Sequence, residues 1–142
     1  MRIVFVCLGN ICRSPAAEGV MHKLAPDLTI DSAGTGGWRV GDAPYGLMQD
    51  AAKARGIDLS ALRARQFTIS DFEDFDLIVA MDRQNKADIE RLRPAGNATP
   101  AQLMAATDVP DPYYTRDFDG ALDMIEAAAR RLLADISQMR DQ

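Results

Sequence analysis

The chain alternates between short strand-like runs and longer helix-like stretches. Three segments have the composition and length of short strands: residues 3–6, 28–33 and 75–81. Four stretches combine apolar residues three or four positions apart with helix caps or stops: residues 16–24, 45–55, 83–93 and 122–139. Strands that alternate with helices pair in parallel through right-handed crossovers, so the pattern predicts an α/β fold.

A fourth strand is encoded more weakly than the other three. Residues 101–106 are the only candidate, and without a β-branched residue they are equally compatible with a loop or a helix. Ligands of parallel sheets bind beyond the carboxyl ends of the strands. If residues 101–106 form the last strand, the turn at 108–114 lies at the same edge of the sheet as the segment that follows residues 3–6.

Length and composition narrow the class of protein. With 142 residues and 47% hydrophobic content, the chain suits a single domain spanning residues 1–142. No apolar run approaches the roughly 20 residues that cross a bilayer, and the N-terminus lacks a signal-peptide pattern, so we expect a cytoplasmic protein. Two cysteines five positions apart fit a reducing compartment. The net charge of −5 disfavours nucleic acid or an anionic membrane as partner.

The segment 7–15 joins the first strand to the first helix and has the features of an anion-binding loop. The five residues between its cysteine and its arginine suffice to wrap the oxygens of a phosphate with backbone N–H groups. Gly9 and Asn10 are the residue types that most readily adopt a positive φ. Ser14 is expected as the N-cap and Pro15 at the first helical position, which directs the positive end of the helix at the loop.

A cysteine at the start of such an anion-binding loop indicates a nucleophile. A cysteine beside an arginine at a helix N-terminus has its pKa lowered from about 8.5 to roughly 3.5–7.5, so Cys7 is expected to be a thiolate. Arg13 offers a planar fork that grips two phosphate oxygens, and the Ser14 hydroxyl can donate to the sulfur. The alternative is a structural cysteine at a buried strand end. The spacing of Cys7 and Arg13 recurs by chance, but the agreement of strand, loop and helix favours the nucleophile.

Two residues outside this loop narrow the chemistry further. His22 is the only histidine, which excludes most Ser-His-Asp and Cys-His catalysis and nearly all zinc sites, and it is expected to be a partly exposed helix residue. Trp38 is the only tryptophan and lies in the glycine-rich stretch 34–44. It is interpreted either as a wall for an aromatic substrate beside the anion site or as a cover over the core.

The turn at 108–114 presents a candidate acid. Pro110 and Pro112 restrict the backbone on either side of Asp111, so its carboxyl is held stiffly. For Asp108 and Asp119, ordinary turn or cap roles are favoured instead.

Taken together, the two segments resemble the low-molecular-weight protein tyrosine phosphatase family. Its Cys-x5-Arg-Ser signature matches residues 7–14, near the N-terminus, and its late Asp-Pro-Tyr-Tyr motif matches residues 111–114. Both motifs stand in the family's order, and the resemblance covers essentially the whole chain. It implies a four-stranded parallel sheet of order 2-1-3-4 with helices on both faces and a phosphate-binding loop after the first strand.

The resemblance also implies roles for individual residues. Cys7 would form a phosphocysteine intermediate, Arg13 would clamp the phosphate, and Asp111 would act as general acid and then as base. Residues implied to bind phosphate or support the loop are Leu8, Gly9, Asn10, Ile11, Cys12 and Ser14. Residues implied to receive the phosphotyrosine ring are Trp38, Tyr113 and Tyr114.

Substrate and partners follow from the same resemblance. The substrate would be a phosphotyrosine protein and inorganic phosphate a product, with no metal or other cofactor. In bacteria, the opposing partner of such enzymes is often a tyrosine autokinase of polysaccharide export.

Four other functions agree less well with the sequence. Thioredoxin-coupled arsenate reductases need two further cysteines, and none follows Cys12. Phosphoarginine phosphatases of the same family have threonine where this chain has Ile11, so an aryl phosphate is favoured. Aspartyl phosphatases need an Asp-x-Asp motif after an apolar strand, and segments 74–76 and 117–119 do not follow one. A non-catalytic phosphate-binding module would need neither the thiolate nor the fixed acid.

Cys12 has two interpretations. It is either a small residue packed in the loop or a thiol that traps oxidised Cys7 as a disulfide, which would make inactivation by peroxide reversible.

Overall fold

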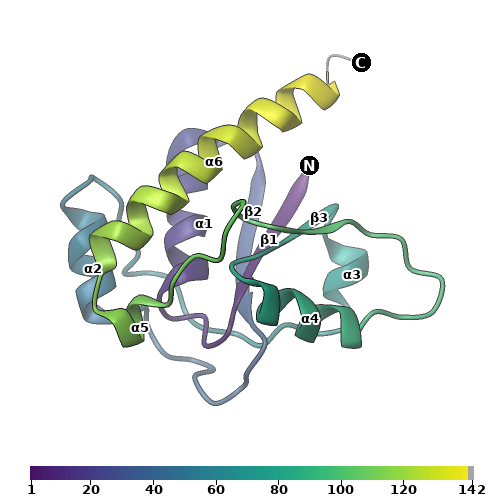
Figure 1. Cartoon of the computed structure of the whole chain (residues 1–142), viewed down its shortest axis with the longest axis horizontal. Helices are drawn as coiled ribbons and strands as arrows, with labels where there is room; N and C mark the ends of the chain where they lie inside the picture. The colour runs from purple at the N-terminus through teal and green to yellow at the C-terminus, as the bar shows by residue number, and fades with distance from the viewer. Residues whose placement is uncertain (141–142) are drawn as a thin grey trace.

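The computed structural model describes residues 1–140 and has the predicted alternation of strands and helices (Figure 1). The strands are β1 (Arg2–Cys7), β2 (Thr29–Gly34), β3 (Leu77–Ala80) and β4 (Ala101–Leu103). The helices are α1 (Arg13–Leu24), α2 (Gly46–Lys53), α3 (Asp71–Asp74), α4 (Arg83–Arg91), α5 (Pro112–Thr115) and α6 (Phe118–Arg140). No helix within this part of the chain has the length and apolar character to cross a bilayer.

The four strands form one parallel sheet of order β2-β1-β3-β4, which confirms the predicted fold. Residue Ile3 of β1 pairs with Ile30 on one side and with Leu77 on the other. The weakly encoded fourth strand exists but is shorter than the expected 101–106, since pairing with β3 ends at Leu103. An edge strand pairs on one side only, so its length depends on one neighbour.

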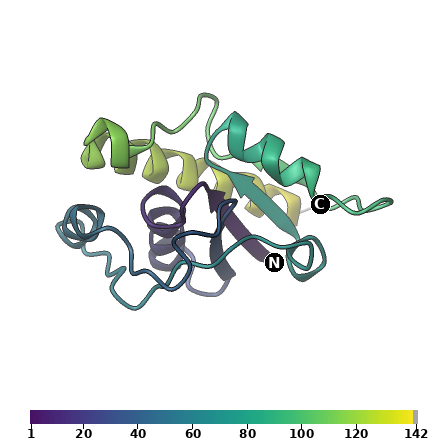
Figure 2. The same ribbon diagram turned by 90° about the horizontal axis from the view of Figure 1, so that it is seen from below.

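The central strand β1 divides the core into two layers. Ile3 and Phe5 point to the face covered by α1, α2 and α6, whereas Val4 and Val6 point to the face covered by α3 and α4. Figures 1 and 2 both show α1 and α2 on the opposite side of the strands from α3 and α4. All four side chains have no exposed area, and this two-sided burial explains why the strand is a continuous apolar run.

The start of α1 differs from the expectation. The helix begins at Arg13 with Cys12 in the N-cap position, so Pro15 is its third residue rather than its first. Ser14 does not cap the helix, because its hydroxyl lies 3.0 Å from Cys7 Sγ and is occupied in the loop. The contact with the sulfur takes the place of the capping bond.

The end of β2 supports the loop after β1 from below. Gly34 is paired with Cys7, and a Cβ atom at Gly34 would lie 2.7 Å from the Leu8 carbonyl oxygen and 3.2 Å from Asn10 Cβ. Backbone atoms of the loop cannot move away as a flexible side chain could. Only glycine therefore fits beneath the loop at this position.

Replacing Gly34 by alanine should displace the loop. We expect the free energy of unfolding to fall by about 1–3 kcal/mol, as for other insertions into packed interiors, and phosphate binding to weaken. The measurements are urea unfolding and calorimetric titration with inorganic phosphate. Gly46→Ala is the control, because a Cβ atom there meets nothing within 4 Å and alanine favours the helix. Equal loss of phosphate binding in both variants would contradict the role of Gly34.

Candidate active site

Cys7 ends β1 with 3% of its surface exposed, and the loop curls around its sulfur. The carbonyl groups of Cys7 and Leu8 accept hydrogen bonds from the N–H groups of Thr35 (2.8 Å) and Gly36 (2.9 Å), which belong to the segment after β2. The N–H of Asn10 points the other way and lies 3.3 Å from Cys7 Sγ. The loop thus directs carbonyls outward and an amide inward, which is the polarity of an anion cradle.

Asn10 makes the sharp bend of the loop. Its φ is 57°, in the left-handed region, whereas Gly9 does not have the positive φ that the sequence suggested. The side-chain amide nitrogen of Asn10 donates to Ser14 Oγ at 2.8 Å, and that oxygen lies 3.0 Å from Cys7 Sγ. Side-chain bonds therefore hold the left-handed residue and the sulfur together.

Arg13 lies beside the sulfur and is held by three acceptors. Its Nη1 donates to Asp82 Oδ2 (2.7 Å) and to the Val109 carbonyl (2.9 Å), and its Nη2 lies 3.5 Å from Asp111 Oδ2. Burial opposes the charge, but Cys7 and the two carboxylates raise the pKa of Arg13 above its ordinary value. Its Nε is buried and has no acceptor among the described residues. One edge of the guanidinium is therefore left for an anion.

Asp111 stands at the N-cap of α5, where Pro112 begins the helix. One carboxylate oxygen accepts the N–H of Tyr113 at 3.1 Å, and the other faces Arg13. The side chain keeps 23% of its surface exposed. The acid predicted from the sequence is thus held at both oxygens but remains partly exposed, and it lines the same cavity as Cys7.

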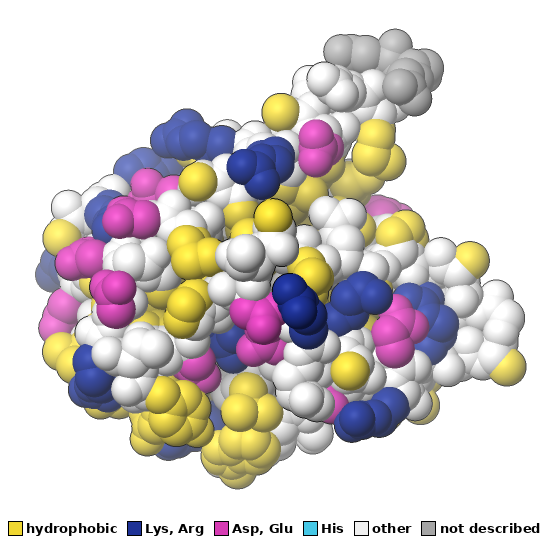
Figure 3. Space-filling view, in the orientation of Figure 1, with side chains coloured by type: hydrophobic (Ala, Val, Ile, Leu, Met, Phe, Trp, Pro, Cys, Tyr) yellow, Lys and Arg dark blue, Asp and Glu magenta, His cyan; other side chains and the backbone are white. Residues whose placement is uncertain are grey.

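A cavity at the loop brings most of the sequence-predicted residues together, although Asn10, Arg13 and Ser14 do not line it. It is lined by Cys7, Leu8, Gly9, Ile11, Cys12, Trp38, Arg39, Asp111, Tyr113 and Tyr114. The side chains of Trp38 (67% exposed) and Tyr114 (71% exposed) stand at its rim, so Trp38 does not cover the core. Hydrophobic side chains gather at the lower edge of the molecule, where α5 and the segment after β2 lie (Figure 3).

The second cysteine of the loop is also a free thiol. Burial, followed by the charges of Asp111 and Cys7, raises the pKa of Cys12 to about 12. At neutral pH this thiol is protonated and is a poor nucleophile. Its redox role stays a prediction.

The sequence pattern did not identify three residues that hold the site. Asp82 was expected only as the cap of α4; it does accept the Asn85 N–H at 2.7 Å, but its other oxygen holds Arg13. The sequence feature that could have revealed this role is the position of Asp82 just after a central strand, at the same edge of the sheet as Cys7. Ser32 and Glu18 lie behind the loop, and no local pattern marks them.

Comparison with known proteins identifies the class that this fold and site define. The sequence profile of the family described as low molecular weight phosphotyrosine protein phosphatase matches residues 2–142. The chain therefore belongs to the low molecular weight protein-tyrosine-phosphatase family.

Individual relatives agree with this assignment. The low molecular weight protein-tyrosine-phosphatase YfkJ of Bacillus subtilis is 36% identical over 96% of both chains, and its crystal structure superposes with a TM-score of 0.92 over 98% of this chain and 96% of that one. PtpA of Staphylococcus haemolyticus is 38% identical over 92% of this chain and 90% of its own. An arginine phosphatase of Drosophila has the same fold, with 30% identity, a TM-score of 0.91, and coverage of 96% and 98%.

Replacing Asp82 by asparagine should release Arg13 without removing the cap of α4, since asparagine also caps helices. A hydrogen bond to a charged group contributes about 1.5–3 kcal/mol, so kcat/KM for an aryl phosphate should fall by roughly ten- to a hundredfold. The melting temperature should also fall, because the buried Arg13 charge loses one of its two carboxylate partners. Asp108→Asn is the control, because Asp108 is exposed and its polar contacts in the described structure are with the N–H and side chain of Arg83, near the same helix end. Equal losses in both variants would disprove the Asp82 assignment.

Proposed function

We propose that this chain hydrolyses phosphotyrosine in proteins through a phosphocysteine intermediate on Cys7. The observation that carries the proposal is the buried Arg13 guanidinium, whose Nε–H has no acceptor in the described structure. It lies beside the Cys7 sulfur, which accepts the N–H of Asn10 and is 3.0 Å from Ser14 Oγ. A buried donor without a partner is costly unless a ligand satisfies it. A phosphate over the sulfur would do so.

The first chemical step breaks the bond between phosphorus and the phenol oxygen. The Cys7 sulfur attacks phosphorus in line with that bond, and the Arg13 fork follows the equatorial oxygens into the transition state. Asp111 gives a proton to the departing phenol oxygen. In the second step Asp111 takes a proton from water as the water attacks phosphorus, and the sulfur leaves with its electron pair. The product is inorganic phosphate, and no cofactor takes part.

Other loop residues support these steps. Leu8, Gly9, Ile11 and Cys12 supply the backbone that surrounds the phosphate, while Asn10 holds the bend. Ser14 stabilises the sulfur as a leaving group, because its oxygen lies at hydrogen-bond distance.

The rim of the cavity favours an aromatic substrate. Trp38, Tyr113 and Tyr114 would enclose the tyrosine ring, and flat aromatic faces suit that contact. Ile11 in the loop favours an aryl phosphate over phosphoarginine. We further propose a bacterial, cytoplasmic enzyme whose substrate is a phosphotyrosine protein such as a tyrosine autokinase; relatives from Bacillus and Staphylococcus support the bacterial part.

Replacing Cys7 by serine should abolish turnover while phosphate still binds. A serine hydroxyl is almost wholly protonated at neutral pH and cannot form the covalent intermediate. The measurement is p-nitrophenyl phosphate turnover, together with acid trapping of phosphoenzyme, which should appear on Cys7 of the wild type only. Retention of more than a few per cent of activity would rule out the covalent mechanism.

Replacing Asp111 by asparagine should discriminate between leaving groups. Tyrosine leaves as a phenolate of pKa about 10 and needs a proton, whereas p-nitrophenolate leaves more easily. We expect the burst rate with a phosphotyrosine peptide to fall by about 10² to 10⁴, the usual contribution of general acid catalysis, and that with the nitrophenyl ester to fall much less.

Asp108→Asn serves as the matched control for this measurement and should leave both burst rates unchanged. An equal loss on the two substrates in Asp111→Asn would indicate structural damage, and a selective loss in Asp108→Asn would assign the acid to Asp108.

A further inference from the structure

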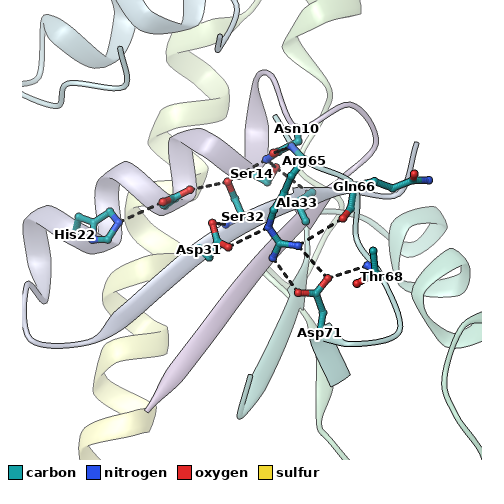
Figure 4. Close-up of polar contacts among 11 residues, drawn as sticks. Asn10, Ser14, His22, Asp31, Ser32, Ala33, Arg65, Gln66, Thr68 and Asp71 are labelled. Atoms are coloured by element: carbon teal, nitrogen blue, oxygen red, sulfur yellow. Dashed lines mark hydrogen bonds and ion pairs between the residues drawn. The ribbon is translucent and has the colours of Figure 1, made fainter. Parts of the chain in front are cut away.

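A buried carboxylate lies behind the loop, on the side away from the cavity. Glu18 of α1 has 6% of its surface exposed. Its Oε1 accepts the hydroxyl of Ser32 at 2.6 Å, and its Oε2 lies 3.3 Å from Nε2 of His22, whose side chain is 47% exposed. Figure 4 shows the line of contacts that starts at His22 and continues past Ser32 towards the loop.

The line of contacts ends at the nucleophile. Asn10 Nδ2 donates to Ser32 Oγ at 2.9 Å and to Ser14 Oγ at 2.8 Å, and Ser14 Oγ lies 3.0 Å from Cys7 Sγ. The backbone N–H of Arg65 donates to Asn10 Oδ1 at 3.0 Å. A donor on that side requires the oxygen of the amide there, so the nitrogen must face the two serines.

Counting hydrogens fixes the direction of the bonds that join Asn10, the two serines and Glu18. The amide nitrogen of Asn10 has two hydrogens, and each serine oxygen accepts one of them. Each serine must then give its own hydrogen to another acceptor. For Ser32 that acceptor is Glu18; for Ser14 it is the Cys7 sulfur at 3.0 Å, in preference to the Ala33 carbonyl at 3.4 Å.

We propose that Glu18 is a positioning residue for the nucleophile: as the acceptor for Ser32, it acts together with the Arg65 N–H to hold the orientation of the Asn10 amide, and so commits the Ser14 hydroxyl to the Cys7 sulfur. This inference rests on the proposed role of Cys7. It adds to that role a buried acceptor on α1 that does not touch the substrate.

The charged groups around Glu18 are consistent with an acceptor. The pKa of Glu18 is raised overall, mainly by burial and also by the charge of Asp31 on β2. The bond from Ser32 and the contact with His22 on α1 act in the opposite direction. The Asp31 carboxylate is itself paired with Arg65 Nε at 3.0 Å. Because Glu18 is buried, water cannot replace the hydrogen bond from Ser32. Turning the Ser32 hydroxyl away from Glu18 is therefore costly.

The test compares an acceptor with a non-acceptor of similar shape at this position. Glu18→Gln keeps an oxygen for Ser32, and its amide nitrogen can donate to Nε2 of His22 in one tautomer, whereas Glu18→Met offers no acceptor. The readout is the rate of carboxymethylation of Cys7 by iodoacetate as a function of pH, followed by mass. We expect the profile of Glu18→Met to move about one unit to higher pH, a roughly tenfold slower reaction on its acid side, while Glu18→Gln follows the wild type.

Ser32→Ala provides a second route if Glu18→Met does not fold. It removes the intervening hydroxyl and should shift the profile in the same direction. An unchanged profile in the variants without the acceptor, or an equal shift in Glu18→Gln, would overturn the proposal. Because alkylation is followed without turnover, failure of the proposed function would appear separately, as absence of selective Cys7 labelling in the wild type.

Discussion

The architecture of the site depends on one buried cation. Arg13 has only 3% of its surface exposed, and a charge in that environment must be matched by acceptors held at fixed positions. Its partners come from two distant segments: Asp82 after β3, and Val109 and Asp111 in the segment after β4. The guanidinium thereby joins the ends of three strands. The proposed acid stands near the proposed nucleophile because the segment that carries Asp111 binds Arg13, which belongs to the same loop as Cys7.

The parallel sheet supplies the rigid frame for this arrangement. Because β1 is central and buried on both faces, the position of its last residue, Cys7, is set by pairing with Gly34 of β2 and by the pairing of the preceding Val6 with Ala80 of β3. The loop that follows has no regular structure of its own, and it is held by Thr35 and Gly36 outside and by the Asn10 side chain within. Most of the geometry that would act on phosphate is therefore formed before substrate binds, which limits the reorganisation needed in the transition state.

Two kinds of surface surround the sulfur and separate recognition from reactivity. Towards solvent, Trp38 and Tyr114 form an exposed rim that is free to select the substrate. Towards the interior, the buried residues Ser32 and Glu18 are hydrogen-bonded to each other, and Ser32 accepts a hydrogen bond from Asn10 of the loop. On the proposed function, variation at the rim would change the substrate without disturbing the sulfur, whereas changes behind the loop would affect the sulfur without touching the substrate.

The sequence alone determined the fold class, the sheet order through family resemblance, and the phosphatase family, all of which are confirmed. It could do so because the residues of the loop at 7–14 are neighbours in the chain and act together, so their spacing carries the chemistry. The roles of Cys7, Arg13 and Asp111 remain predictions, although the structure places them together.

Only the tertiary structure decided which residues support the site. Asp82 is separated from Arg13 by 69 positions and Ser32 from Asn10 by 22, and an aspartate or serine has no local pattern that reveals a distant partner. The start of α1 was also decided by tertiary structure. The Ser14 hydroxyl contacts the Cys7 sulfur, seven residues away, and does not cap the helix. Local periodicity encodes burial and secondary structure, whereas a polar partner is chosen by the packing that brings two segments together.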